Sequence, residues 1–208
     1  METSLTVFYT YRLHGKLALL PRLYTFLRQL RGEHASDGRA LLLDLGESCA
    51  ADVFPCALTG GRSTLIALDA MGYDAANVTG QLSDDARLRL ETMHFQMVLV
   101  DADHAYEKDG VRATVNPGEC AATAELCIDM NPARKTGVDG QTLQLADVEQ
   151  GQVGMATLDV SDQRFRLTAA RALDVPDNVP HDPTIAGTVE FILSEARYLQ
   201  RKQDINAN

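Results

Sequence analysis

The chain has 208 residues, of which 45% are hydrophobic and 23% are charged. This composition is typical of a globular protein with one sizeable core, and we expect a single domain over residues 1–200 and a flexible tail at 201–208. The net charge of -10 argues against non-specific binding to nucleic acid or to an anionic membrane surface. No basic segment precedes a long apolar stretch at the N-terminus, and no window approaches the ~18 apolar residues of a membrane span. We therefore expect a cytoplasmic protein, unless an export leader has been removed, and a protein or small-molecule partner.

Hydrophobic patterns in the first hundred residues predict strands that alternate with helices. Residues 5–9 alternate as a strand does, and 19–30 carry apolar residues at helical spacing. The nearly continuous apolar run at 40–45 is typical of a strand buried on both faces. This alternation indicates a parallel sheet in an α/β core. Further helices are predicted at 63–71 and 83–93, and further strands at 73–78 and 97–100.

From residue 111 onward the pattern changes to short strands separated by Gly, Asn and Asp turns. We expect mostly antiparallel pairing in this half of the chain. A terminal helix is predicted at 184–200, with its apolar residues on one side. The strands expected in this half lie at 111–115, 122–129, 141–148, 153–160 and 164–173.

Five segments follow one another in the N-terminal part of the sequence, at 10–15, 19–23, 41–48, 58–62 and 70–75. In this order they closely resemble the N-terminal half of the calcineurin-like metallophosphoesterases, in particular the 5'-nucleotidase group. Weaker similarity continues at 98–104 and 116–118, which resemble the family's Gly-His-x-His and Asn-Pro-Gly segments. The resemblance implies an α/β fold in the form of a four-layer α/β/β/α sandwich with mixed parallel and antiparallel sheets. The site would lie at the loop ends of the strands.

Little of the chemistry that this family needs is retained. A two-metal phosphoesterase uses carboxylates, histidines and an asparagine to bind two cations and activate water. The family's Asp-x-His corresponds to Arg12-Leu13-His14, its Gly-Asp to Gly46-Glu47, and its Gly-Asn-His-Glu to residues 79–82, which contain neither Asn nor His. We therefore predict that phosphatase activity is lost. The residual alternative is a phosphoesterase in which His14, Glu47 and His104 hold manganese.

All four cysteines lie in two matched C-x6-C segments, Cys49 with Cys56 and Cys120 with Cys127. By the resemblance, both segments should border the former metal site. In a reducing cytoplasm, paired cysteines bind metal more often than they form structural disulfides. Four thiolates suit a [4Fe-4S] cluster or zinc, and the wide spacing favours the cluster. Buried core cysteines and a redox-active disulfide remain as alternatives.

We therefore predict a metallophosphoesterase-like protein that has exchanged the two-metal centre for a four-cysteine site. Its expected role is electron transfer or assembly within a complex, with a protein or redox partner. A metal-free pseudoenzyme that acts as a scaffold is the second hypothesis. The oligomeric state is left open by the sequence.

Overall fold

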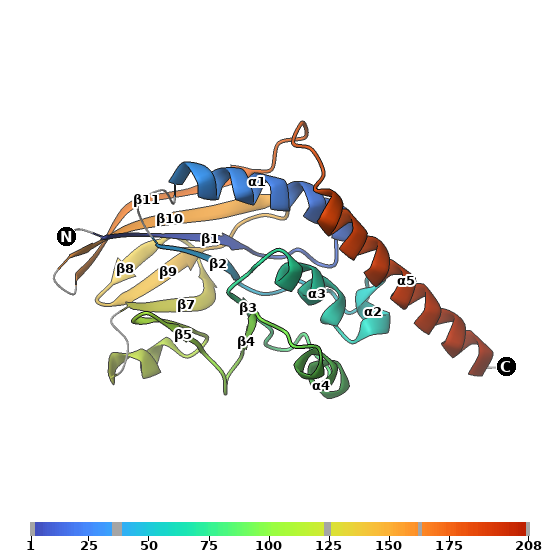
Figure 1. The fold of residues 1–208 in the computed structure, drawn as a ribbon. Helices are drawn as coiled ribbons and strands as arrows, with labels where there is room; N and C mark the ends of the chain where they lie inside the picture. The colour runs from blue at the N-terminus through green and yellow to red at the C-terminus, as the bar shows by residue number, and fades with distance from the viewer. Residues whose placement is uncertain (1–2, 35–38, 123–125, 162–163, 207–208) are drawn as a thin grey trace.

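The structure, a computed structural model, describes residues 3–34, 39–122, 126–161 and 164–206. Two β-sheets pack face to face, and helices cover the outer face of the larger sheet (Figure 1). The chain therefore has the predicted α/β architecture with mixed sheets.

The larger sheet joins parallel N-terminal strands to an antiparallel C-terminal hairpin. Its strands are β1 (Thr3–Thr10), β2 (Arg39–Asp44), β3 (Ala75–Asn77), β4 (Val98–Val100), β10 (Gln152–Ser161) and β11 (Arg164–Asp174). They run in the order β11-β10-β1-β2-β3-β4. The neighbours from β1 to β4 are parallel, whereas β10 pairs antiparallel with β1 and with β11.

The smaller sheet is built by the middle of the chain. Its strands are β5 (Tyr106–Lys108), β6 (Val111–Thr114), β7 (Leu126–Ala133), β8 (Gly137–Asp139) and β9 (Thr142–Ala146). They run in the order β5-β6-β7-β9-β8. The central β7 is parallel to both of its neighbours, and the two edge strands pair antiparallel. Parallel pairing in the centre of this sheet departs from the predicted antiparallel arrangement.

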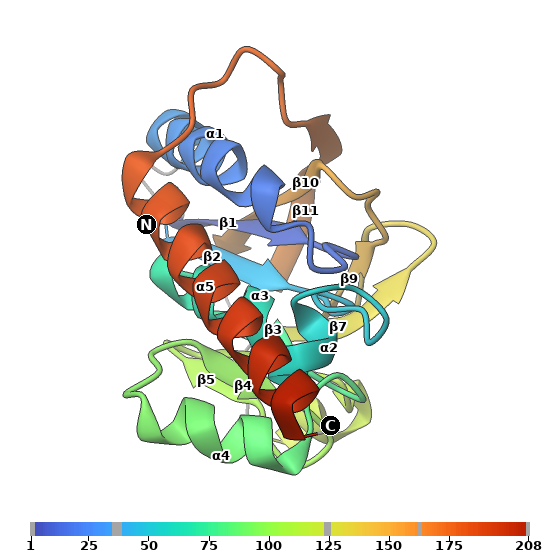
Figure 2. The same cartoon turned by 90° about the vertical axis from the view of Figure 1, so that its right-hand side faces the viewer.

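Most helices lie against the larger sheet, and Figure 2 shows α5 crossing in front of it and α1 above β1. The helices are η1 (Leu17–Leu19), α1 (Leu20–His34), α2 (Cys56–Thr59), α3 (Arg62–Ala70), α4 (Asp84–Thr92), η2 (Pro117–Ala122) and α5 (Pro183–Asn206). The Ser83 hydroxyl caps α4 by accepting a hydrogen bond from the Ala86 N–H at 3.3 Å.

Two hydrophobic cores explain the layers. Alternate residues of one strand point to opposite faces of a sheet, so Phe8 of β1 joins the core under the helices whereas Val7 joins the core between the sheets. Leu42 and Leu43 of β2 divide in the same way. The larger sheet is therefore buried on both faces, which accounts for the continuous apolar run that predicts β2.

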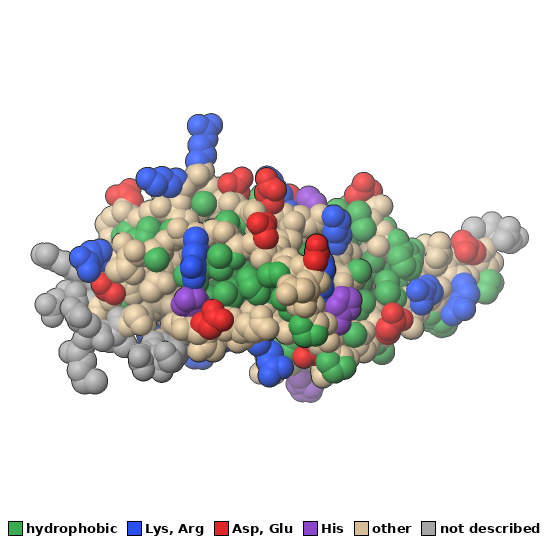
Figure 3. Space-filling view, turned by 90° about the horizontal axis from the view of Figure 1, so that it is seen from above, with side chains coloured by type: hydrophobic (Ala, Val, Ile, Leu, Met, Phe, Trp, Pro, Cys, Tyr) green, Lys and Arg blue, Asp and Glu red, His purple; other side chains and the backbone are tan. Residues whose placement is uncertain are grey.

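The C-terminal helix differs from the prediction. Residues 201–208 are predicted as a flexible tail, yet α5 continues to Asn206, and residues 207–208 lie outside the described part. No helix in the described part of the chain combines the length and the apolar character that a membrane span needs. On the face seen from above, acidic and basic side chains are interspersed among apolar ones (Figure 3).

Candidate functional site

The loops that follow β1 and β2 form one end of the larger sheet. Because the two strands are parallel and adjacent, their carboxyl ends meet at the same edge. Three backbone hydrogen bonds join the loops: the N–H groups of Arg12, His14 and Gly15 donate to the carbonyls of Gly46, Glu47 and Ser48 at 3.1, 3.0 and 2.8 Å. This pairing brings together His14 and Glu47, as the sequence predicts.

The Glu47 carboxylate accepts hydrogen bonds from three side chains. Its Oε1 atom lies 2.7 Å from the Tyr11 hydroxyl, and its Oε2 atom lies 3.3 Å from Arg12 Nε and 3.1 Å from His14 Nε2. The Arg12 guanidinium also lies over the Tyr11 ring, 4.5 Å from its centroid, in a cation–π contact. Both carboxylate oxygens are therefore occupied by donors from the β1 loop.

Backbone conformation fixes this arrangement. Arg12, His14 and Glu47 have φ angles of 57°, 49° and 51°, which lie in the left-handed region that residues other than glycine seldom adopt. Such conformations persist where surrounding structure holds them, and they are common at functional sites. Here the three backbone hydrogen bonds between the loops hold them.

Hydrogen bonding also sets the titration of the cluster. The bond from the Tyr11 hydroxyl holds the pKa of Glu47 below its ordinary value, with His14 and Arg12 contributing in the same direction. The pKa of Tyr11 is raised, chiefly by burial and then by the neighbouring Glu47. Glu47 is therefore an ionised carboxylate that already has a cationic partner.

A second carboxyl lies beneath this cluster, at the end of β2. Asp44 is fully buried, and its oxygens accept hydrogen bonds from the Thr10 hydroxyl at 2.8 Å and from the Gly46 N–H at 3.1 Å. Burial raises the pKa of Asp44 to about 7, although these two bonds work to lower it. The Thr10 hydroxyl also lies 3.1 Å from the Tyr73 hydroxyl. Asp44 therefore belongs to a buried polar network and not to the exposed surface of the site.

In the loop after β3, the side-chain amide of Gln81 forms hydrogen bonds with the neighbouring loops. Gln81 Oε1 accepts hydrogen bonds from the Ser48 hydroxyl at 3.1 Å and the Cys49 N–H at 3.2 Å, and Gln81 Nε2 donates to the Asn77 carbonyl at 2.7 Å. Asn77 Nδ2 in turn donates to the carbonyls of Leu45 and Met130. The stretch that corresponds to the family's Gly-Asn-His-Glu motif thus fixes neighbouring loops to one another.

His104 lies in a different cluster. Its Nδ1 atom is 2.9 Å from Asp101 Oδ1, and the other oxygen of Asp101 pairs with Arg87. Burial works to raise the pKa of Asp101, but its hydrogen bonds with His104 and the Asp103 N–H, together with the nearby Arg87 guanidinium, outweigh this and lower it. In the described part of the chain, no hydrogen bond or ion pair joins His104 to His14 or Glu47. The predicted trio of His14, Glu47 and His104 is therefore joined only in part.

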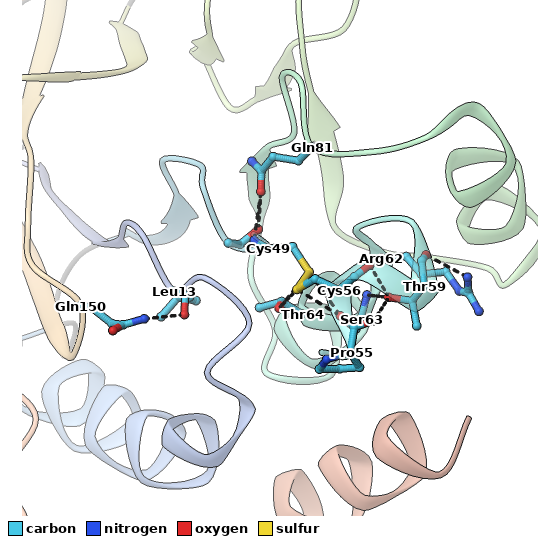
Figure 4. The surroundings of a disulfide bond; sticks show 11 residues. Leu13, Cys49, Pro55, Cys56, Thr59, Arg62, Ser63, Thr64, Gln81 and Gln150 are labelled. Carbon is cyan, nitrogen blue, oxygen red and sulfur yellow. Dashed lines mark hydrogen bonds between the residues drawn. A yellow bond between two sulfur atoms is a disulfide. The ribbon is translucent and has the colours of Figure 1, made fainter. Parts of the chain in front are cut away.

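The predicted four-cysteine centre is wrong. Cys49 is bonded to Cys56 and Cys120 to Cys127, with Cα–Cα distances of 5.6 and 5.8 Å that fall within the range of ordinary disulfides. Figure 4 shows the Cys49–Cys56 bond and its surroundings. Sulfurs that are bonded to each other offer no thiolate, so neither a [4Fe-4S] cluster nor zinc can be held by the four cysteines together.

The manganese alternative also lacks a suitable set of ligands. Across residues 3–34, 39–122, 126–161 and 164–206, no three His, Cys, Asp or Glu side chains are grouped so that they could hold one ion. The structure thus conflicts with every cofactor that the sequence suggests.

Comparison with known proteins bears on the fold. The chain is similar to the crystal structure of the calcineurin-like phosphoesterase YfkN from Bacillus subtilis, with a TM-score of 0.60 and 10% identity, over 96% of this chain and 100% of that one. The fold is that of the calcineurin-like phosphoesterases. No sequence model of a protein family and no curated protein matches the chain. The resemblance seen in the N-terminal segments is thereby confirmed at the level of fold.

Proposed function

We propose that this protein is a non-hydrolytic, metal-free binding domain with the fold of the calcineurin-like phosphoesterases. One observation carries the proposal: at the ends of β1 and β2, the Arg12 side chain pairs with the Glu47 carboxylate at 3.3 Å. By the resemblance, Arg12 stands where the family has a ligand carboxylate and Glu47 stands at a second ligand position. A cation of the chain therefore neutralises the carboxylate that a metal would need.

The donor set does not fit a two-metal centre. Such a centre needs several carboxylate, imidazole and amide donors that converge on two ions. Here Glu47 is shared by Tyr11, Arg12 and His14, Asp44 is buried in its own hydrogen-bond network, and Gln81 is engaged by the loop after β2. A metal ion at this place would also meet the positive charge of Arg12.

The same geometry favours contact with a protein partner. Arg12, His14 and Glu47 stay well exposed, with 46%, 41% and 50% of their side chains accessible to solvent. Their loops are held rigidly by backbone hydrogen bonds, so the charged groups are presented in a fixed arrangement. A fixed pattern of opposite charges is the kind of surface that gives an interface its specificity.

A hydrolysis assay tests the proposal. The wild-type protein and its His14→Ala variant are incubated with p-nitrophenyl phosphate, bis-p-nitrophenyl phosphate and a 5'-nucleotide, each with manganese, magnesium, zinc or calcium. We expect both proteins to give the same release of product as buffer with metal alone. Manganese-dependent release by the wild type that is lost in His14→Ala would contradict the proposal and would favour a residual phosphoesterase.

A further inference from the structure

The Cys49–Cys56 disulfide forms part of the wall of a cavity of about 290 Å³. The loop Gly80–Ser83 and the glycines Gly60 and Gly61 also line this cavity. Glycine is required at Gly61, because a Cβ atom there would lie 2.0 Å from the carbonyl oxygen of Gln81. The disulfide therefore lines a cavity that is large enough for a small organic molecule.

The two sulfurs differ in their surroundings. Cys49 is 8% exposed and Cys56 only 1%. The sulfur of Cys56 packs against Gly15, where an added Cβ atom would come within 2.7 Å of it. A molecule that enters the cavity therefore reaches Cys49 more easily than Cys56.

Two buried hydroxyl groups lie beside the disulfide, as Figure 4 shows. Ser63 Oγ is 3.2 Å from the Cys49 sulfur and 3.6 Å from the Cys56 sulfur, and Thr64 Oγ1 is 3.5 and 4.0 Å from the same atoms. Both residues belong to the first turn of α3, the end of a helix that favours negative charge. Sulfur in a disulfide is a weak acceptor, whereas a thiolate is a strong one, so these donors stabilise the reduced pair more than the oxidised pair.

We propose that Cys49–Cys56 is a thiol–disulfide exchange site for a small thiol about the size of cysteine. The thiolate of the ligand forms a bond with the Cys49 sulfur as the bond between Cys49 and Cys56 breaks, and the electron pair leaves with Cys56 as a thiolate. A second ligand thiolate then attacks the outer sulfur of the mixed disulfide and releases Cys49. Two ligand thiols are oxidised to one disulfide, and the protein disulfide takes up their two electrons and two protons.

A matched pair of cysteine variants tests the assigned roles. The Cys56→Ser and Cys49→Ser variants of the full chain, each with one free thiol at this site, are mixed with cystine, and mixed disulfides are counted by intact-protein mass spectrometry. We expect Cys49 in Cys56→Ser to form its adduct at least about tenfold faster than Cys56 in Cys49→Ser, because reactivity requires access. Equal rates, or no adduct on Cys49, would overturn the proposal.

A second measurement keeps the native disulfide and does not depend on cysteine variants that fold. Wild type and the Ser63→Ala/Thr64→Val variant are equilibrated in cysteine–cystine buffers, and each cysteine pair is assayed by alkylation. We expect the variant to hold Cys49–Cys56 about tenfold more in the oxidised form, because hydrogen bonds to the thiolate are lost. An unchanged equilibrium would overturn the proposal, as would reduction of both disulfides in parallel with loss of the circular dichroism signal. Neither outcome depends on whether the protein hydrolyses phosphoesters.

Discussion

Asp44 allows a quantitative test of the electrostatics beneath the site. Its folded-state pKa of about 7 lies above the ordinary value of 3.8, which applies to the unfolded chain. The folded state therefore binds this proton more tightly than the unfolded state does. The stabilisation from the protonated group is fully present below about pH 4 and is lost as the pH rises through about 7.

The size of the effect follows from the two pKa values. Because one pKa unit corresponds to about 1.4 kcal/mol, Asp44 should remove roughly 3 kcal/mol from the free energy of unfolding between pH 5 and pH 8. Asp44→Asn keeps the shape of the side chain and an oxygen that accepts from the Gly46 N–H, but it does not titrate. The free energy of unfolding of the variant, relative to wild type, should therefore rise by roughly 3 kcal/mol over the same range.

Urea unfolding followed by circular dichroism at pH 5, 6.5 and 8 measures this difference. Asp177→Asn is a suitable control, because its side chain is 99% exposed and pairs with Arg22 at the surface. We expect the control to show the same pH dependence as wild type. If Asp44→Asn also follows wild type at all three pH values, the reasoning about the buried carboxyl is refuted.

Two further predictions concern the loops of the site. Gly61→Ala should destabilise the fold by about 3 kcal/mol or more, because the new Cβ atom would lie 2.0 Å from the Gln81 carbonyl oxygen. Gly72→Ala is the control: no atom lies within 4 Å of its Cβ position, so it should cost only about 1 kcal/mol for its positive φ. Urea unfolding compares the two variants, and equal losses of stability would contradict the packing argument. Tyr11→Phe removes the 2.7 Å hydrogen bond to Glu47, so the pKa of Glu47 should move up towards its ordinary value in an NMR titration, and an unchanged pKa would show that Tyr11 does not control it.

The sequence predicts much of the fold because central strands such as β1 and β2 are buried on both faces. The run at 40–45 can only be accommodated between two apolar layers, and it forms β2 at Arg39–Asp44. The sequence does not predict β5 and β8, because the three residues of each form no apolar run, whereas the equally short β3 and β4 lie in apolar segments. The end of α5 was missed for a related reason, because its exposed last turns lack the buried apolar residues that mark a helix.

The candidate site combines residues that the resemblance singles out with residues that it does not. The family resemblance singles out His14 and Glu47 as candidate ligands, and in the structure the two side chains lie 3.1 Å apart at the ends of two adjacent parallel strands. Tyr11 and Gln81 were not foreseen, because hydrogen bonds made by single side chains leave no spacing in the sequence. For Gln81, the signal available was its position within the segment that replaces the Gly-Asn-His-Glu motif.

The cysteine prediction was wrong because it rested on a premise about the compartment. Reduced thiols are the rule in a cytoplasm, and the cytoplasmic location itself stays a prediction. Two disulfides are typical of proteins in oxidising environments, and they weigh against that location. Each cysteine is bonded to the other cysteine of its own C-x6-C segment, and the Cα atoms of the two pairs lie 5.6 and 5.8 Å apart.

Manganese binding tests the central claim most directly. Electron paramagnetic resonance counts free Mn²⁺ in the presence of wild type and of an Arg12→Asp/Glu47→Asp variant, which restores the carboxylates of the family's Asp-x-His and Gly-Asp segments. We predict that wild type leaves the free Mn²⁺ signal unchanged, because Arg12 neutralises Glu47 at the ends of β1 and β2. Stoichiometric loss of the signal with wild type, reversed by His14→Ala, would contradict the account of a metal-free domain.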